Sequence, residues 1–202
     1  MRLHSFLPRS RANGPGVRAV LWVQGCTLGC PGCFNPETHG REAGEDCGVA
    51  EVFARIEAAG EIEGLTVSGG EPLQQRAAVL GLLQRVRRET RLSVILFTGF
   101  TWEEVLAMPQ SGELLACVDV LIAGRYAVAQ RVATGLQGSA NKTFHFLTAR
   151  YGPADLAATP EAEVLILPDG QVVLSGIRPV RSQQFVPVPL IGALASRSDD
   201  GR

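Results

Sequence analysis

Apolar residues occur along much of the chain in short unbroken runs that alternate with longer amphipathic stretches. A short apolar run bounded by turn residues predicts a buried strand, and apolar positions three and four residues apart predict a helix. Strands are predicted at residues 17–25, 64–70, 92–99 and 118–124, and helices at 49–59, 72–90 and 101–108. Pro72 suits the first turn of its helix, and Thr101 with Glu104 forms a possible capping box.

This alternation of strand and helix predicts an α/β fold with a parallel sheet and right-handed crossovers. Glycine follows each of the four strands, at Gly25, at Gly69 and Gly70, at Gly99 and at Gly124. In parallel α/β folds, ligands bind at the carboxyl ends of the strands. The loop "CTLGCPGC" (26–33) and the loop "SGGEP" (68–72) both lie at such ends, so we expect them to face one site.

The pattern changes after residue 124. Residues 142–149 are predicted to form one more strand. Residues 163–176 read as a hairpin that turns at Pro168-Asp169-Gly170. Residues 178–202 become rich in proline, serine and charge, which is typical of an extended tail.

Composition narrows the function classes. The 202 residues carry a net charge of −1, from 19 basic and 20 acidic side chains, which gives no reason to expect nucleic acid or an anionic membrane as a partner. The amino-terminal residues lack the apolar core of a signal peptide, and no apolar run approaches the roughly 18 residues of a membrane span. A cytoplasmic location, where thiols stay reduced, is therefore expected.

Five cysteines, three of them clustered, argue against a disulfide framework and for a metal or redox site. The clustered three are Cys26, Cys30 and Cys33, in the pattern C-x3-C-x2-C. A structural zinc ion and a [4Fe–4S] cluster both take four ligands, so one position is open. A zinc knuckle completed by Cys47 or His39 is one alternative, but it leaves the "SGGEP" loop unexplained. Cys47 and Cys117 have no close cysteine neighbour and are expected to be ordinary thiols.

The order of the motifs resembles the radical S-adenosylmethionine superfamily. Within it, the chain is most similar to the activating enzymes of anaerobic (class III) ribonucleotide reductase, over about residues 5–147. The stretches that carry the resemblance are "NGPGVR" (13–18), "GCTLGCPGCFN" (25–35), "SGGEPL" (68–73), "TGFTWEE" (98–104), "DVLIAGRY" (119–126) and "GSANKTFHFL" (138–147). One departure is Ala123, where the family usually has an acidic residue.

The resemblance implies an incomplete βα barrel with parallel strands over residues 1–150, followed by a hairpin extension and tail over 151–202. It implies one [4Fe–4S] cluster on the three clustered cysteines, with S-adenosylmethionine at the fourth iron. Carried over by position, Gly32 and Phe34 would lie beside the adenosyl moiety. Gly69, Gly70 and Glu71 would meet the amino group of the methionine moiety.

The activity implied by the resemblance is reductive cleavage of S-adenosylmethionine to methionine and a 5′-deoxyadenosyl radical. That radical would generate a glycyl radical on a partner enzyme, expected to be anaerobic ribonucleoside-triphosphate reductase, with a flavodoxin- or ferredoxin-type electron donor. Two alternatives remain open: a radical enzyme that modifies another peptide or a small molecule, and a non-catalytic iron–sulfur protein. No segment of the chain is an evident lid, so a partner surface is expected to cover the site.

Overall fold

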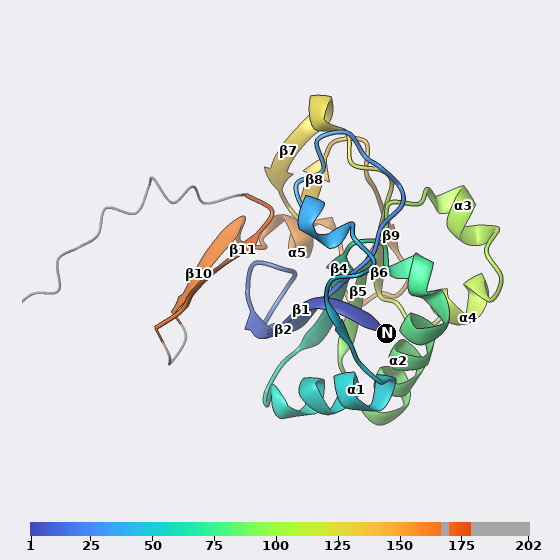
Figure 1. The fold of residues 1–202 in the computed structure, drawn as a ribbon, viewed down its shortest axis with the longest axis vertical. Helices are drawn as coiled ribbons and strands as arrows, with labels where there is room; N and C mark the ends of the chain where they lie inside the picture. Colours follow the sequence, from blue (N-terminus) through green and yellow to red (C-terminus); the bar gives the residue numbers. More distant parts are fainter. Residues whose placement is uncertain (167–169, 179–202) are drawn as a thin grey trace, which may run out of the picture.

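The structure is a computed structural model that describes residues 1–166 and 170–178. Its centre is a seven-stranded sheet with the order β3-β1-β2-β4-β5-β6-β9 (Figure 1). Two smaller sheets pair β7 with β8 and β10 with β11. The strands are β1 Arg2–Ser10, β2 Arg18–Val23, β3 Glu45–Asp46, β4 Gly64–Gly69, β5 Ser93–Phe97, β6 Val120–Ala123, β7 Arg131–Thr134, β8 Gln137–Ser139, β9 Thr143–Phe146, β10 Ala162–Ile166 and β11 Val172–Gly176.

The four predicted buried strands are confirmed as the parallel centre of the sheet. Strands β2, β4, β5 and β6 lie side by side and run in one direction. Nearly all of their residues are buried, which explains why each strand reads as a continuous apolar run. This largely parallel sheet with helices agrees with the expected incomplete βα barrel.

Antiparallel strands flank this centre on both sides. Strand β9 pairs with β6 and lies inside the predicted range 142–149. Strand β1 pairs with β2 and has no counterpart among the predicted elements. Its pairing shifts register twice, so that its buried positions, Leu3, Leu7 and Ser10, do not alternate as in a regular strand.

The predicted helices are confirmed, with one change at the start of the second. Residues 72–75 form a 3₁₀ turn that Glu71 caps and Pro72 begins, and the α-helix follows from Arg76. The capping box of Thr101 and Glu104 is present. The α-helices are α1 Val49–Ala58, α2 Arg76–Glu89, α3 Trp102–Leu106, α4 Ser111–Leu115 and α5 Pro153–Ala157; the 3₁₀ helices are η1 Pro36–Thr38, η2 Pro72–Gln75 and η3 Val128–Gln130.

Two hydrophobic clusters hold these layers together. The larger cluster joins α1 and α2, which lie side by side in Figure 1, to the sheet through side chains such as Phe53 and Leu83. The smaller cluster contains Ile95 and Ile122 of the sheet and Leu156 of α5. The short helix α5 therefore contributes to the core, although it lies in the predicted extension.

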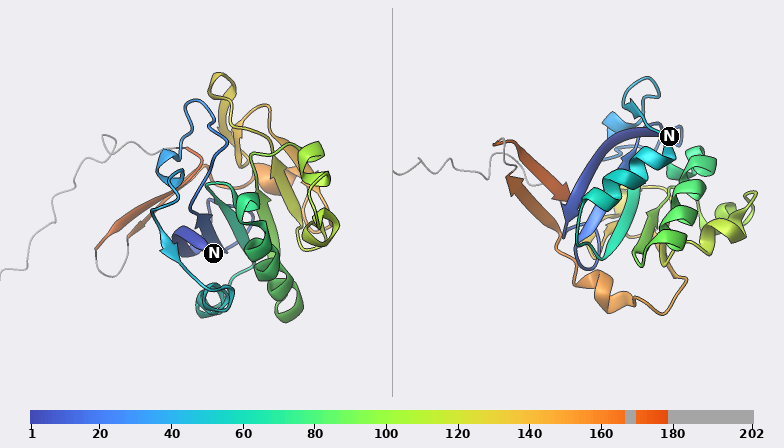
Figure 2. Two further views of the ribbon diagram at one scale, coloured as in Figure 1. Left: turned by 45° about the vertical axis from the view of Figure 1, so that its right-hand side comes forward. Right: turned by 90° about the horizontal axis from the view of Figure 1, so that it is seen from below.

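The predicted hairpin is confirmed in its two strands. Strands β10 and β11 pair antiparallel, with Val164 opposite Leu174, and project from the rest of the structure (Figure 2). The Glu163 carboxylate accepts a hydrogen bond from the Arg11 N–H at 2.9 Å and fixes the hairpin to the segment after β1. The predicted turn residues 168 and 169, and the predicted tail from residue 179 onward, lie outside the described residues.

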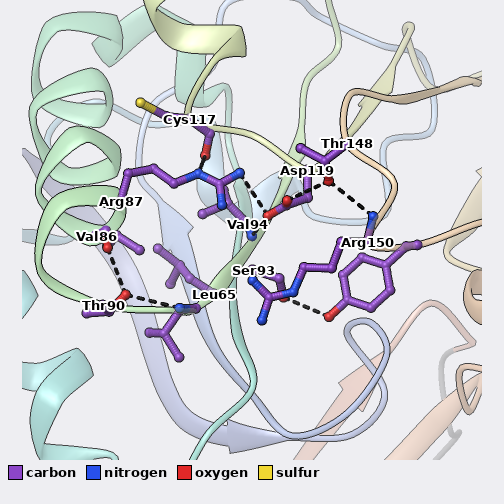
Figure 3. Close-up of polar contacts among 12 residues, drawn as sticks. Leu65, Val86, Arg87, Thr90, Ser93, Val94, Cys117, Asp119, Thr148 and Arg150 are labelled. Atoms are coloured by element: carbon purple, nitrogen blue, oxygen red, sulfur yellow. Dashed lines mark hydrogen bonds and ion pairs between the residues drawn. The ribbon is translucent and has the colours of Figure 1, made fainter.

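Polar contacts fasten the start of the C-terminal segment to the sheet (Figure 3). The Thr148 hydroxyl donates to Asp119 at 2.7 Å, and Asp119 also forms an ion pair with Arg87 at 3.0 Å. The Tyr151 hydroxyl lies 2.8 Å from the Ser93 hydroxyl. Among the described residues, no helix combines the length and the apolar character needed to cross a bilayer.

Candidate functional site

A cavity of about 330 Å³ lies at the carboxyl ends of the parallel strands. The loop after β2 supplies the clustered cysteines, the loop after β4 supplies the Gly-Gly-Glu sequence, and the loop after β5 supplies Gly99. The expectation that the first two loops face one site is confirmed. The predicted site residues that line the cavity are Cys26, Cys30, Cys33, Phe34, Gly69, Gly70 and Glu71.

The three thiols suit a multi-iron cluster better than a single ion. Two thiolates on one zinc ion lie at most about 4.6 Å apart, because each Zn–S bond measures about 2.3 Å. In the described part of the chain, the one group of three potential ligands within 4.8 Å of one another does not include these thiols. A cluster with several irons spreads its thiolates farther apart. Burial raises the pKa of the Cys26 thiol, and a bound metal would have to displace that proton.

The remaining cysteines do not complete a zinc site with the clustered three. Cys47 is buried in the larger core and does not line the cavity. It lies within 4.8 Å of Glu45 and Glu51, but both carboxylates are paired with Arg55, at 2.5 and 2.7 Å. Cys117 is also buried in the larger core. Both are placed as ordinary core thiols.

Gly69 and Gly70 allow the loop after β4 to pack against the loop that carries the cysteines. Gly69 has a φ of +106°, and a Cβ there would lie 2.4 Å from the Val23 nitrogen. A Cβ on Gly70 would lie 2.4 Å from the Gly25 carbonyl oxygen. The Gly70 N–H donates to Val23 O at 2.8 Å. Any larger side chain would separate the two loops that form the cavity wall.

Glu71 ties the ends of β4 and β5 together. Its side chain is wholly buried, and Oε1 accepts from Leu73 N–H at 2.9 Å and from the Thr98 hydroxyl at 2.8 Å. Oε2 accepts from Gly99 N–H at 2.6 Å. Burial raises the pKa of Glu71, against the hydrogen bonds, which act to lower it. Among the described residues, Oε2 accepts only the one hydrogen bond from Gly99 N–H and could accept another from a ligand. A contact between Glu71 and the methionine amino group stays a prediction.

Phe34 contributes an aromatic side chain to the cavity lining. The residue is 41% exposed, and its ring forms an edge-to-face contact with Tyr126, with the centroids 5.3 Å apart. A flat ring held in this way is a surface on which a nucleobase can stack. Gly32 faces Val128 instead, because a Cβ on Gly32 would lie 3.2 Å from that side chain. Gly32 is not among the described residues that line the cavity, so its predicted place beside the adenosyl moiety stays a prediction.

The expectation that a partner surface covers the site stays a prediction, and one further segment of the chain contributes to the cavity wall. Residues 173–177, from strand β11 and just after it, line the cavity. Asn13 Nδ2 donates to the Ser175 hydroxyl at 2.6 Å and holds this wall in place. The sequence predicts the hairpin, but nothing in its own residues indicates that one of its strands lines the cavity.

Sequence reasoning also missed Lys142, which lines the same cavity. Its ammonium donates to the Gly124 carbonyl oxygen at 2.6 Å, at the carboxyl end of β6. Burial lowers the pKa of Lys142, and the nearby Cys30, Glu71 and Cys33 act in the opposite direction. A signal was available, because Lys142 is the only lysine in the sequence.

Comparison with known proteins gives two findings. Residues 12–145 match the family model described as "4Fe-4S single cluster domain". Proteins named anaerobic ribonucleoside-triphosphate reductase-activating protein are 35% identical in Vibrio cholerae serotype O1 and 31% identical in Salmonella typhimurium, each over 73% of this chain and 99% of the relative. The protein of that name in Enterobacteria phage T4 is 34% identical over 62% of this chain and 81% of its own length.

The bacterial relatives are covered almost completely, while about a quarter of this chain lies outside each alignment. The cluster-domain model ends at residue 145, just before α5 and the β10–β11 hairpin. The chain thus belongs to the 4Fe-4S single cluster domain family and, within it, to the family of anaerobic ribonucleoside-triphosphate reductase-activating proteins.

Proposed function

We propose that this chain activates an anaerobic ribonucleoside-triphosphate reductase by generating a glycyl radical on it. The observation that carries the proposal is the cavity that three thiols share with the Gly-Gly-Glu loop, in a chain of this family. The printed name of the relatives supplies the partner. When bound, the cluster supplies the electron that cleaves S-adenosylmethionine and so provides the 5′-deoxyadenosyl radical that takes a hydrogen atom from the partner's glycine.

In this proposal Cys26, Cys30 and Cys33 would hold the cluster, and S-adenosylmethionine would bind beside it in the same cavity. The tight packing of Gly69 and Gly70 keeps the methionine-binding loop close to those thiols. The Phe34 ring provides the stacking surface for the adenine. Glu71 acts first as a positioning residue, because its buried carboxylate fixes the loops after β4 and β5.

The enclosure of the site is shared between the chain and its partner. In this proposal residues 1–150 are the cluster-binding domain and residues 151–202 its extension, and the described hairpin of that extension adds one wall of the cavity. The substrate is a glycine in a loop of the partner, and glycine suits the reaction because flanking amides stabilise a backbone radical. A flavodoxin- or ferredoxin-type protein is the proposed electron donor, and the cytoplasm the proposed location.

The test is anaerobic incubation of the reconstituted protein with S-adenosylmethionine, dithionite and its cognate reductase. We expect methionine and 5′-deoxyadenosine to form, and a glycyl radical signal on the reductase in electron paramagnetic resonance. Cys30→Ala should remove both results, and Cys117→Ala should leave both unchanged. Efficient coupled turnover of a free small molecule without any protein substrate would favour a small-molecule enzyme instead, and no cleavage at all would favour a non-catalytic protein.

A further inference from the structure

The chain uses lysine once. Of its 19 lysine and arginine residues, Lys142 is the only lysine. Arginine and lysine differ in shape, since the guanidinium is a wide planar fork and the ammonium is a compact charge with three donors. A chain that otherwise uses arginine throughout therefore has its one compact cation in the loop between β8 and β9, at the cavity.

The position of Lys142 places positive charge where the strand ends meet. Among the described residues that line the cavity, Lys142 is the only lysine or arginine. Its ammonium donates to Gly124 O at 2.6 Å, and Cys30, Cys33 and Glu71 lie close enough to act on it electrostatically. The hydrogen bond to Gly124 thus holds the ammonium in place, and Lys142 lines the same cavity as the three thiols.

No carboxylate forms an ion pair with this ammonium within the part of the chain that the structure describes, and Glu71 acts on it only from a greater distance. Every ion pair found there uses an arginine or the amino terminus. The neighbouring cation, Arg125, is already engaged by Glu104 and by the Gly99 carbonyl oxygen. One of the three Lys142 donors goes to Gly124, so two remain for an anion in the cavity.

We propose that Lys142 binds the carboxylate of the methionine moiety of S-adenosylmethionine. The inference rests on the proposed function, which places that molecule in the cavity. A partly buried cation that forms no ion pair favours an anionic ligand, and a carboxylate is the one anionic group that S-adenosylmethionine carries. A lysine suits the place because a compact ammonium can hold both the Gly124 carbonyl and a ligand oxygen in a confined space.

The experiment is a double comparison of protein and ligand, measured as dissociation constants by anaerobic calorimetry on the cluster-loaded full chain. Wild type and Lys142→Met are each titrated with S-adenosylmethionine and with its decarboxylated analogue, which keeps the adenosine, sulfonium and ammonium groups. A charge-assisted hydrogen bond predicts that the substitution weakens S-adenosylmethionine roughly 10- to 150-fold. The analogue should lose less than about threefold. Arg88→Met, which removes an exposed cation at the end of α2, is the matched control and should change neither constant.

Equal losses for both ligands would overturn the proposal, because Lys142 would then act on the cluster or on the fold. The absence of any loss would overturn it as well. Neither result touches the proposed function, since the wild-type protein would still form the glycyl radical on its reductase.

A second measurement needs no variant and covers the case in which Lys142→Met fails to take up its cluster. Because the sequence has one lysine, mass spectrometry after mild acetylation reports on that ammonium alone, apart from the amino terminus. Saturating S-adenosylmethionine should protect Lys142, and saturating decarboxylated analogue should leave it reactive. Equal protection by both ligands would contradict the assignment.

Discussion

Replacement of Glu71 by alanine should destabilise the fold before it affects the chemistry. The buried Leu73 N–H and Thr98 hydroxyl would each lose their acceptor, while the half-buried Gly99 N–H can turn to water. Each orphaned buried donor costs about 1–3 kcal/mol. Burial of the Glu71 carboxylate is itself unfavourable, as its raised pKa indicates, so its removal offsets part of this loss of stability. The expected net loss in the free energy of unfolding is about 2–4 kcal/mol.

Urea unfolding of the metal-free protein, followed by circular dichroism, measures this loss directly. Glu71→Gln keeps one acceptor oxygen but turns an amide donor toward Gly99, so it should lose only about 1–2 kcal/mol. Glu113→Ala, an exposed change on α4, is the matched control and should stay within about 0.5 kcal/mol of wild type. Wild-type stability for Glu71→Ala would refute the claim that this carboxylate joins the ends of β4 and β5.

Three further outcomes follow from the same structure. Alanine at any one of the three clustered cysteines should abolish the iron–sulfur absorbance, whereas Cys117→Ala should leave iron and sulfide content unchanged, as chemical analysis would show. Tyr151→Phe should lower the unfolding free energy by about 0.5–1.5 kcal/mol, because the Ser93 hydroxyl loses a partner; an unchanged denaturation midpoint would argue against that contact. Burial acts to raise the pKa of Asp119, but Val94 N–H, Thr148 and Arg87 hold it below its usual range. Its stabilising effect is therefore present above about pH 4 and lost as the pH falls through the lowered value, so the unfolding free energy of Asp119→Asn should fall less steeply below pH 4 than that of wild type.

The parallel centre of the fold could be predicted from the sequence because its strands are buried on both faces. Continuous apolar runs such as residues 92–99 read directly as strands, and the glycines after them marked the edge where the site lies. Strand β1 could not be predicted in this way. Its two register shifts break the alternation that identifies a half-buried strand.

The hydrogen-bond partners of buried charged residues could not be predicted from the sequence. Arg18 lies in a predicted buried strand, yet its side chain is wholly buried and donates to the Thr66 hydroxyl at 2.9 Å and to the Ser93 hydroxyl at 2.8 Å. These partners come from β4 and β5, and only the assembled sheet brings them together. Glu71 shows the same limit, since the motif predicted a ligand contact while two of its hydrogen bonds go to the loop after β5.

The site likewise contains residues that the sequence could predict and residues that it could not. The cysteine spacing and the Gly-Gly-Glu loop indicated which loops meet, because both depend on local sequence. Lys142 and the wall formed by residues 173–177 depend on how distant segments fold back to the strand ends. Residue type gave a hint only for Lys142, the single lysine of the chain.

The central claim is that this chain removes a hydrogen atom from a glycine of its reductase, and isotope transfer tests it most directly. The reductase is prepared with glycine deuterated at the α-carbon and is mixed anaerobically with the reconstituted protein, S-adenosylmethionine and dithionite. We predict that the 5′-deoxyadenosine recovered by mass spectrometry carries deuterium as the glycyl radical forms. A glycyl radical accompanied only by unlabelled 5′-deoxyadenosine would contradict the account.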